Sequence, residues 1–175
     1  MRTESELIND LLELYERIDD QANQLVRRHG HRLKCRRGCA TCCVDDLSVF
    51  EVEARNIQTN HGDLLRTESA HESGGCAFLD HDGCCRIYRN RPYVCRTQGL
   101  PLRWIDETDG GDLVEMRDIC PLNDEGEPVE ELSESDCWTI GPVENELRGL
   151  ACEQAGGEMR RVKLRDLFQT QTTTG

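Results

Sequence analysis

The sequence predicts a small α+β fold with little strand: an irregular cysteine-rich core with short β-hairpins, a long N-terminal helix and a C-terminal helix. Three observations support this prediction. The length of 175 residues suits one domain, hydrophobic residues recur at helical spacing near both ends, and most of the 11 cysteines lie in turn-rich sequence between them. We expect an N-terminal amphipathic helix over residues 1–30, a cysteine cluster domain over 31–122, and an acidic segment with a helix that packs on it over 123–175.

The first predicted helix covers residues 4–29. Thr3 and Glu6 have the spacing of a capping box at its start, and Gly30 follows its last turn. Apolar residues three and four positions apart give this helix one hydrophobic side: they are Leu7, Leu11, Leu14, Ile18, Ala22 and Leu25. We expect this side to pack on the domain, or to contact a protein partner or a second copy of the chain.

Shorter elements are predicted along the middle of the chain. A helix is expected over residues 49–59 with Ser48 as its cap, followed by a polar loop over 59–75. Residues 76–79 and 85–88 bracket a turn that contains Asp82-Gly83, which favours a hairpin.

The second half of the chain contains polar connections and one more helix. Residues 106–112 are predicted as a turn-rich loop, and 123–136 as an acidic, solvated stretch. The last helix is predicted from Pro142, a favourable first residue, to Gln154.

Charge and composition exclude several classes of function. The net charge of −13 makes nucleic acid and anionic membranes poor partners, because both bind basic surfaces. No apolar segment is long enough to span a membrane. The first residues carry acids where a signal peptide needs a basic stretch and then an apolar one, and the cysteine count is odd. We therefore expect a cytoplasmic protein with reduced thiols rather than a secreted disulfide framework.

The cysteines form two groups, and the first lies within nine residues. It contains Cys35, Cys39, Cys42 and Cys43, with Gly38 to help a tight turn. The second contains Cys76, Cys84, Cys85 and Cys95, and Cys120 follows before Pro121. Cys137 and Cys152 are isolated and are interpreted as packed, apolar thiols.

A metal is the expected partner of this many thiols in a reducing compartment. A zinc-type site needs about four thiolates in tetrahedral geometry, and more than four candidates are present. Adjacent side chains tend to point apart, so Cys42 and Cys43 suit two ions, two irons of a cluster, or one metal ligand and one structural thiol. The least favoured alternative is a redox protein that uses Cys42-Cys43 or Cys84-Cys85 as a vicinal dithiol.

The order of these motifs resembles a known family. The run C-x3-C-x2-C-C from Cys35, the phrase CAFLD from Cys76, the phrase CRIYRNRPYVCR from Cys85 and the pair Cys120-Pro121 resemble the YkgJ-type cysteine cluster family, also called the CxxCxxCC domain. The resemblance covers about residues 30–122 and implies a zinc- or iron-chelating domain. The ligands that it implies are Cys35, Cys39, Cys42, Cys43, Cys76, Cys85, Cys95 and Cys120.

The chain also departs from the family pattern. The first spacing has three residues where the family name implies two, Cys84 is an additional thiol beside Cys85, and Thr97-Gln98-Gly99 stands where an aromatic-proline pair is common. Cys85 fits the family phrase better than Cys84.

Basic residues accompany the candidate ligands. Arg86, Arg91 and Arg96 are expected to bind the cofactor by offsetting the negative charge of several thiolates. The cofactor is zinc or iron, with an iron-sulfur cluster as a further form.

The resemblance carries one alternative function. A related cysteine cluster domain looks to be part of flagellin lysine methylases, which implies an iron-sulfur enzyme or an accessory domain of one. No motif for a methyl-donor pocket or for a catalytic residue stands beside the cysteines.

Overall fold

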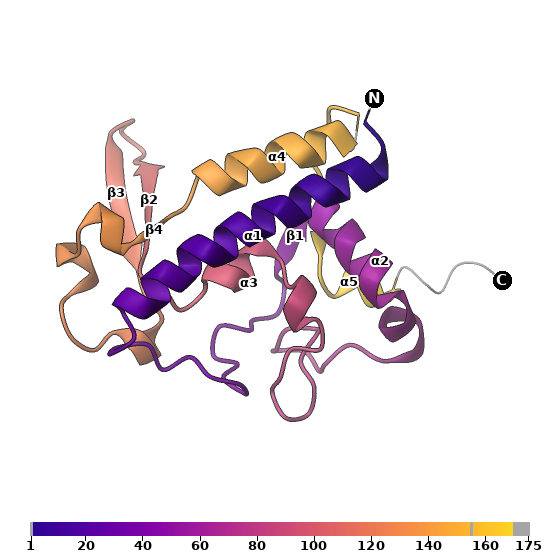
Figure 1. The fold of residues 1–175 in the computed structure, drawn as a ribbon, viewed down its shortest axis with the longest axis horizontal. Helices are drawn as coiled ribbons and strands as arrows, with labels where there is room; N and C mark the ends of the chain where they lie inside the picture. Colours follow the sequence, from indigo (N-terminus) through magenta and orange to yellow (C-terminus); the bar gives the residue numbers. More distant parts are fainter. Residues whose placement is uncertain (1, 155, 170–175) are drawn as a thin grey trace. The chain divides into compact units, whose positions relative to one another are not determined.

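The computed structural model describes residues 2–154 and 156–169 (Figure 1). The chain forms two compact units. Unit 1 consists of Met1–Leu14, Arg36–Pro92 and Glu146–Gly175, and unit 2 consists of Tyr15–Cys35 and Tyr93–Asn145. Each unit draws residues from all three predicted segments, whose boundaries at residues 30 and 122 stay a prediction. The small α+β class predicted from the sequence is confirmed.

The two long terminal helices match their predictions. α1 (Glu4–Arg28) begins at the predicted capping box: the Thr3 N–H donates to Glu6 Oε2 at 2.7 Å, and the Glu6 N–H donates to Thr3 Oγ1 at 3.3 Å. All six residues of its predicted apolar side are buried. α4 (Pro142–Gln154) has the predicted bounds, but it is not the last helix, because the short α5 (Asp166–Gln169) follows it.

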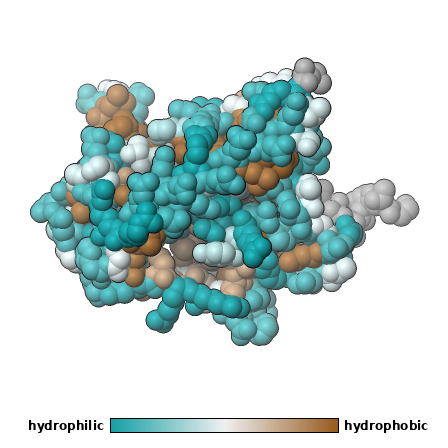
Figure 2. Space-filling view, viewed as in Figure 1, coloured by the Kyte–Doolittle hydropathy of each residue, from teal (hydrophilic) through white to brown (hydrophobic). Residues whose placement is uncertain are grey.

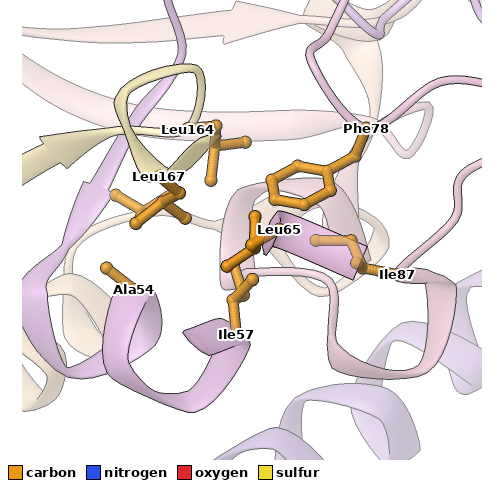
Figure 3. Packing of buried hydrophobic residues seen from close by; sticks show 8 residues of the cluster. Ala54, Ile57, Leu65, Phe78, Ile87, Leu164 and Leu167 are labelled. Atoms are coloured by element: carbon orange, nitrogen blue, oxygen red, sulfur yellow. The ribbon is translucent and has the colours of Figure 1, made fainter. Parts of the chain in front are cut away.

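Unit 1 is built around α2 (Glu51–Thr67) and a two-stranded antiparallel sheet. The strands are β1 (Ser48–Phe50) and β5 (Arg161–Lys163), and Ser48 pairs with Lys163. The 3₁₀ turn η1 (Tyr88–Asn90) and the short helix α5 (Asp166–Gln169) complete the unit. Its core, drawn in Figure 3, consists of Val49, Ala54, Ile57, Leu65, Phe78, Ile87, Leu164 and Leu167.

The predicted helix over 49–59 was wrong at both ends. Ser48 lies in β1, and the Glu53 side chain instead accepts from the N–H of Phe50 at 3.1 Å. The helix also continues through the predicted loop as far as Thr67. It does so because Leu65 is buried in the core. His61 has non-helical dihedral angles, and its Nε2 lies 2.9 Å from the Asn90 side-chain oxygen.

The hairpin predicted between residues 76 and 88 is reduced to one bridge. Leu79 pairs with Cys85 in antiparallel geometry. The turn between them is fixed by Asp80, whose Oδ1 accepts the Cys84 N–H at 2.7 Å and the Asp82 N–H at 2.9 Å. The two arms are joined by main-chain hydrogen bonds from the Asp80 N–H to Cys84 O at 2.8 Å and from the Arg86 N–H to Phe78 O at 2.9 Å.

Unit 2 contains a hairpin that the sequence did not predict. β2 (Leu102–Glu107) and β3 (Leu113–Asp118) pair antiparallel, and the predicted loop over 106–112 supplies their turn. β4 (Trp138–Thr139) pairs parallel to β2 on its other edge. The sheet order is thus β3-β2-β4.

The remaining elements of unit 2 are short. α3 (Tyr93–Thr97) precedes the sheet, and three 3₁₀ turns lie between β3 and β4: η2 (Pro121–Asn123), η3 (Val129–Glu131) and η4 (Glu134–Asp136). The predicted acidic stretch over 123–136 is therefore a series of tight turns. It contributes Val129 and Leu132 to a small cluster with Ile119 and Cys137.

The surface is mainly hydrophilic on the face that Figure 2 shows, with small hydrophobic areas between polar ones. This fits the acidic composition and the net charge of −13. Among the helices of the described residues, none has the length and apolar character needed to cross a membrane.

Candidate metal centre

The first cysteine motif in unit 1 is folded into two consecutive tight turns. The Cys39 N–H donates to Arg36 O and the Cys43 N–H donates to Ala40 O, both at 2.9 Å. Gly38 has φ +81°, a left-handed conformation that favours glycine. Three thiols, those of Cys39, Cys42 and Cys43, therefore lie on one compact loop.

The adjacent thiols of Cys42 and Cys43 lie within hydrogen-bonding reach. The hydrogen bond from Cys43 lowers the pKa of the Cys42 thiol to about 6. The expectation that neighbouring side chains point apart was wrong here, because the backbone turns rather than extending as a strand. This pair supplies a thiolate near neutral pH, which is the form that binds a metal.

Cys76 and Cys85 form a second pair of neighbours in unit 1. Both are packed against the hydrophobic core of that unit. Burial raises the pKa of each thiol, and the charge of Cys76 raises that of Cys85 further. The Cys76 N–H donates to Cys43 O at 2.9 Å, so the two cysteine motifs are joined by a main-chain hydrogen bond.

Cys84 has different surroundings from Cys85. The Arg37 guanidinium hydrogen-bonds to the Cys84 sulfur, which raises the pKa of Arg37. Cys85 instead lies beside Cys76. Within unit 1 the additional thiol is therefore paired with an arginine, while its neighbour faces another cysteine.

Unit 2 holds the other three candidate ligands on separate elements. Cys95 lies on α3, four residues before Gly99, and Cys120 directly precedes η2. Cys35 Sγ accepts a hydrogen bond from Asn123 Nδ2 at 3.4 Å. Gly99 packs so closely against this sulfur that a Cβ atom at residue 99 would lie 2.6 Å from it.

Asn123 is a central residue of unit 2 that the sequence analysis missed. Its side chain is completely buried, with Nδ2 also donating to Gly99 O at 2.8 Å and Oδ1 accepting the Lys34 N–H at 2.7 Å. Its N–H donates to Cys120 O at 2.7 Å. Asn123 thus joins the segments that carry Cys35, Gly99 and Cys120.

A family model for a cysteine cluster domain matches residues 34–121, about half of the chain. The chain belongs to the CxxCxxCC family. The family is described as a "putative zinc- or iron-chelating domain". This confirms the resemblance that the cysteine motifs predicted, and the match contains all eight cysteines that the resemblance implied as ligands. Comparisons with curated proteins and with solved structures gave no match.

The thiols of the CxxCxxCC domain are not gathered at the distances of a formed metal site. Among the residues that the structure describes, no group of three or more histidine, cysteine, aspartate or glutamate side chains could hold an ion as placed. None of the 11 cysteines, all of which lie within the described residues, forms a disulfide bond. The donor set nonetheless fits zinc or iron, because it consists of soft sulfur ligands. The close packing of Gly99 against Cys35 Sγ leaves no room for a Cβ atom at residue 99.

The three predicted counter-charges each have another contact. Arg86 pairs with Glu68 at 2.9 Å, and Arg91 lies over the Tyr88 ring at 4.2 Å. Arg96 pairs with Asp19 at 2.6 Å. Burial raises the pKa of the Cys85 thiol, and the positive charges of Arg91 and Arg86 partly offset this increase. Their role toward a cofactor stays a prediction.

The carboxylates after the first cysteine motif bind the C-terminal segment of unit 1. Asp45 Oδ1 accepts from Arg165 Nε at 2.8 Å, and Lys163 Nζ lies 3.0 Å from Asp46 Oδ1. Arg165 also donates to His71 O at 2.6 Å and to Gly75 O at 2.9 Å. Arg165 therefore holds the loop before Cys76 and the segment after Cys43, although no sequence pattern indicated it.

The two isolated cysteines stand apart from the CxxCxxCC motif. Cys137 is buried in the small cluster of unit 2, where burial raises the pKa of its thiol. Cys152 is half-buried on α4 in unit 1. Cys137 fits the predicted role of a packed thiol, whereas Cys152 is only partly buried.

We predict that Gly99→Ala is more damaging than its backbone angle alone requires. Gly99 has φ +92°, and the new methyl group would collide with Cys35 Sγ. The left-handed conformation costs about 1–2 kcal/mol for an alanine. Gly111→Ala is the matched control, because Gly111 has φ +83° in open surroundings. Urea unfolding should show a larger loss of unfolding free energy for Gly99→Ala than for Gly111→Ala. Equal losses in the two variants would contradict the close packing at Cys35.

We also predict that Asp45 contributes stability that is lost in acid. The Arg165 hydrogen bond, with that of the Gly74 N–H, lowers the pKa of Asp45 from 3.8 to about 2. A depressed folded-state pKa gives stability that is present above about pH 4 and lost as the pH falls toward 2. Asp45→Asn should therefore lower the urea midpoint near neutral pH, with a difference from wild type that shrinks in acid.

Asp46→Asn is the control for this experiment. Its ion pair with Lys163 is exposed, and exposed pairs contribute little to stability. A difference between wild type and Asp45→Asn that does not change with pH would show that the charge of the Asp45 carboxylate is not the source of its stability.

Proposed function

We propose that this protein binds zinc or iron through cysteine thiolates, and that metal binding stabilises its fold. The ligands in this proposal are Cys35, Cys39, Cys42, Cys43, Cys76, Cys85, Cys95 and Cys120. Family membership supports the metal, and the hydrogen bond from the Cys76 N–H to Cys43 O is the observation that best supports the site. It joins two cysteine motifs that are far apart in the sequence.

The proposal follows from the chemistry of the donors. Five of the eight thiols belong to unit 1, where Cys42 lies beside Cys43 and Cys76 beside Cys85. Four thiolates satisfy a tetrahedral zinc or iron ion. Cys84 is left out, because its sulfur is bound by Arg37.

Metal binding would also compensate for a limited hydrophobic core. The hydrophobic fraction of 37% includes the cysteines, and the core cluster of unit 1 is flanked by Cys76 and Cys85 rather than by larger apolar side chains alone. A bound dication converts thiols that burial keeps protonated into ligands and cross-links the loops that carry them. The protein would work in the cytoplasm, where reducing conditions keep such thiols available.

An iron-sulfur cluster held by the same thiolates is the alternative form of this proposal. In this form the protein would be an iron-sulfur enzyme or the accessory domain of one. Visible absorption together with acid-labile sulfide in anaerobically purified protein identifies a cluster, whereas colourless protein with stoichiometric zinc identifies a zinc site.

We predict that the metal depends on the motif cysteines and not on the isolated ones. Elemental analysis of wild-type protein purified without oxygen should give close to stoichiometric zinc or iron. Cys42→Ser and Cys85→Ser should lose most of the metal, because a hydroxyl is a poor substitute for a thiolate with these ions. Cys84→Ser should retain it.

Cys137→Ser and Cys152→Ser are the matched controls, since they remove a thiol of the same type outside the motifs. They should keep the wild-type metal content. Wild-type protein whose stability does not change when the metal is removed, or equal metal loss in the controls, would contradict the proposed function.

A further inference from the structure

Arg32 is a buried cation that has no carboxylate partner among the described residues. It is 2% exposed, and it lies in unit 2 three residues before Cys35. Its Nε donates to the main-chain oxygen of Asn123 at 2.9 Å, while its Nη2 has no hydrogen-bond partner in the part of the chain that the structure describes. None of the ion pairs found within residues 2–154 and 156–169 includes it. A buried charge of this kind is strongly unfavourable unless something compensates it.

Other arginines of unit 2 with buried side chains are compensated. Arg96, whose side chain is 5% exposed, pairs with Asp19 at 2.6 Å. Arg103, at 13%, pairs with Glu115 at 2.7 Å. The absence of such a partner therefore distinguishes Arg32 from arginines in similar surroundings.

The surroundings of Arg32 indicate which negative group its charge could stabilise. Asn123 accepts from Arg32 through its main-chain oxygen and donates to Cys35 Sγ through Nδ2. The Lys34 N–H also binds Asn123, at Oδ1. Arg32 and Cys35, at the two ends of the segment 32–35, therefore both form hydrogen bonds with the buried residue Asn123.

We propose that Arg32 is the counter-charge of a thiolate-metal centre that includes Cys35, with Asn123 holding both groups in place. This inference rests on the proposed function. Several thiolates on one dication carry a net negative charge, and a nearby buried cation favours that charge. An arginine has no lone pair to offer a metal, so Arg32 acts by its charge and not as a ligand.

The proposal predicts that Arg32→Met has different effects in the metal-free and in the metal-loaded protein. In the metal-free protein Arg32 is an uncompensated charge, so Arg32→Met should leave stability unchanged or raise it. In the metal-loaded protein the charge is compensated, so the same substitution should weaken zinc binding by about 10- to 100-fold. An arginine that is needed only for packing would lower stability in both forms.

The test measures zinc affinity by competition with a chromophoric chelator under reducing conditions, and urea unfolding with and without zinc. Arg32→Lys keeps the charge and should retain zinc affinity within several-fold, whereas Arg32→Met should not. Arg103→Met is the control, because it removes a mostly buried arginine that already has a carboxylate partner. It should leave zinc affinity as in the wild type.

The outcomes separate this inference from the proposed function. Wild-type protein that fails to bind zinc or iron overturns both. If the wild type and Arg32→Met bind zinc with equal affinity, the role of Arg32 is overturned and the proposed function is not. An Arg32→Met protein that is less stable, or does not fold, in both forms also overturns it, because Arg32 would then be structural.

Discussion

The ionisation of thiols beside a hydrophobic core is the constraint on which the candidate centre depends. Cys76 and Cys85 are packed against the core of unit 1, and burial raises the pKa of both. A thiolate in such a place is unfavourable without a positive charge near it. A metal ion satisfies this need for several thiols together, which is why metal binding and folding are coupled in sites of this kind.

The loops that carry the thiols are held by polar contacts rather than by long strands. In unit 1, Arg165 binds Asp45 and the main-chain oxygens of His71 and Gly75, so that one side chain ties together the segments after Cys43 and before Cys76. In unit 2, Asn123 does the same for the segments of Cys35 and Cys120. These contacts fix the segments that carry the thiols.

Local patterns predicted the parts of the fold that local interactions determine. The periodic apolar residues and the capping box of α1, and Pro142 at the start of α4, are properties of short segments, and both helices were confirmed. The extension of α2 to Thr67 was not predictable in this way, because it depends on the burial of Leu65 by residues far away in the sequence. The β2–β3 hairpin was missed because its turn was interpreted as a loop without strands.

The candidate site shows the same difference between what local patterns predict and what long-range contacts determine. Cysteine spacing was sufficient to indicate the family, since the motifs themselves carry the signal. Asn123, Arg32 and Gly99 could not be found from spacing, because their importance lies in a buried hydrogen bond, an uncompensated charge and a close approach to Cys35. The sequence placed the counter-charges at Arg86, Arg91 and Arg96, and the structure adds a buried arginine for which no carboxylate is found among the described residues.

The central claim is that cysteine thiolates hold a metal. X-ray absorption at the zinc or iron edge of the purified protein tests it most directly, because the first coordination shell reports the ligand type. The account predicts a shell of sulfur atoms alone, about four per metal at about 2.3 Å for zinc. A first shell of nitrogen or oxygen atoms would contradict it.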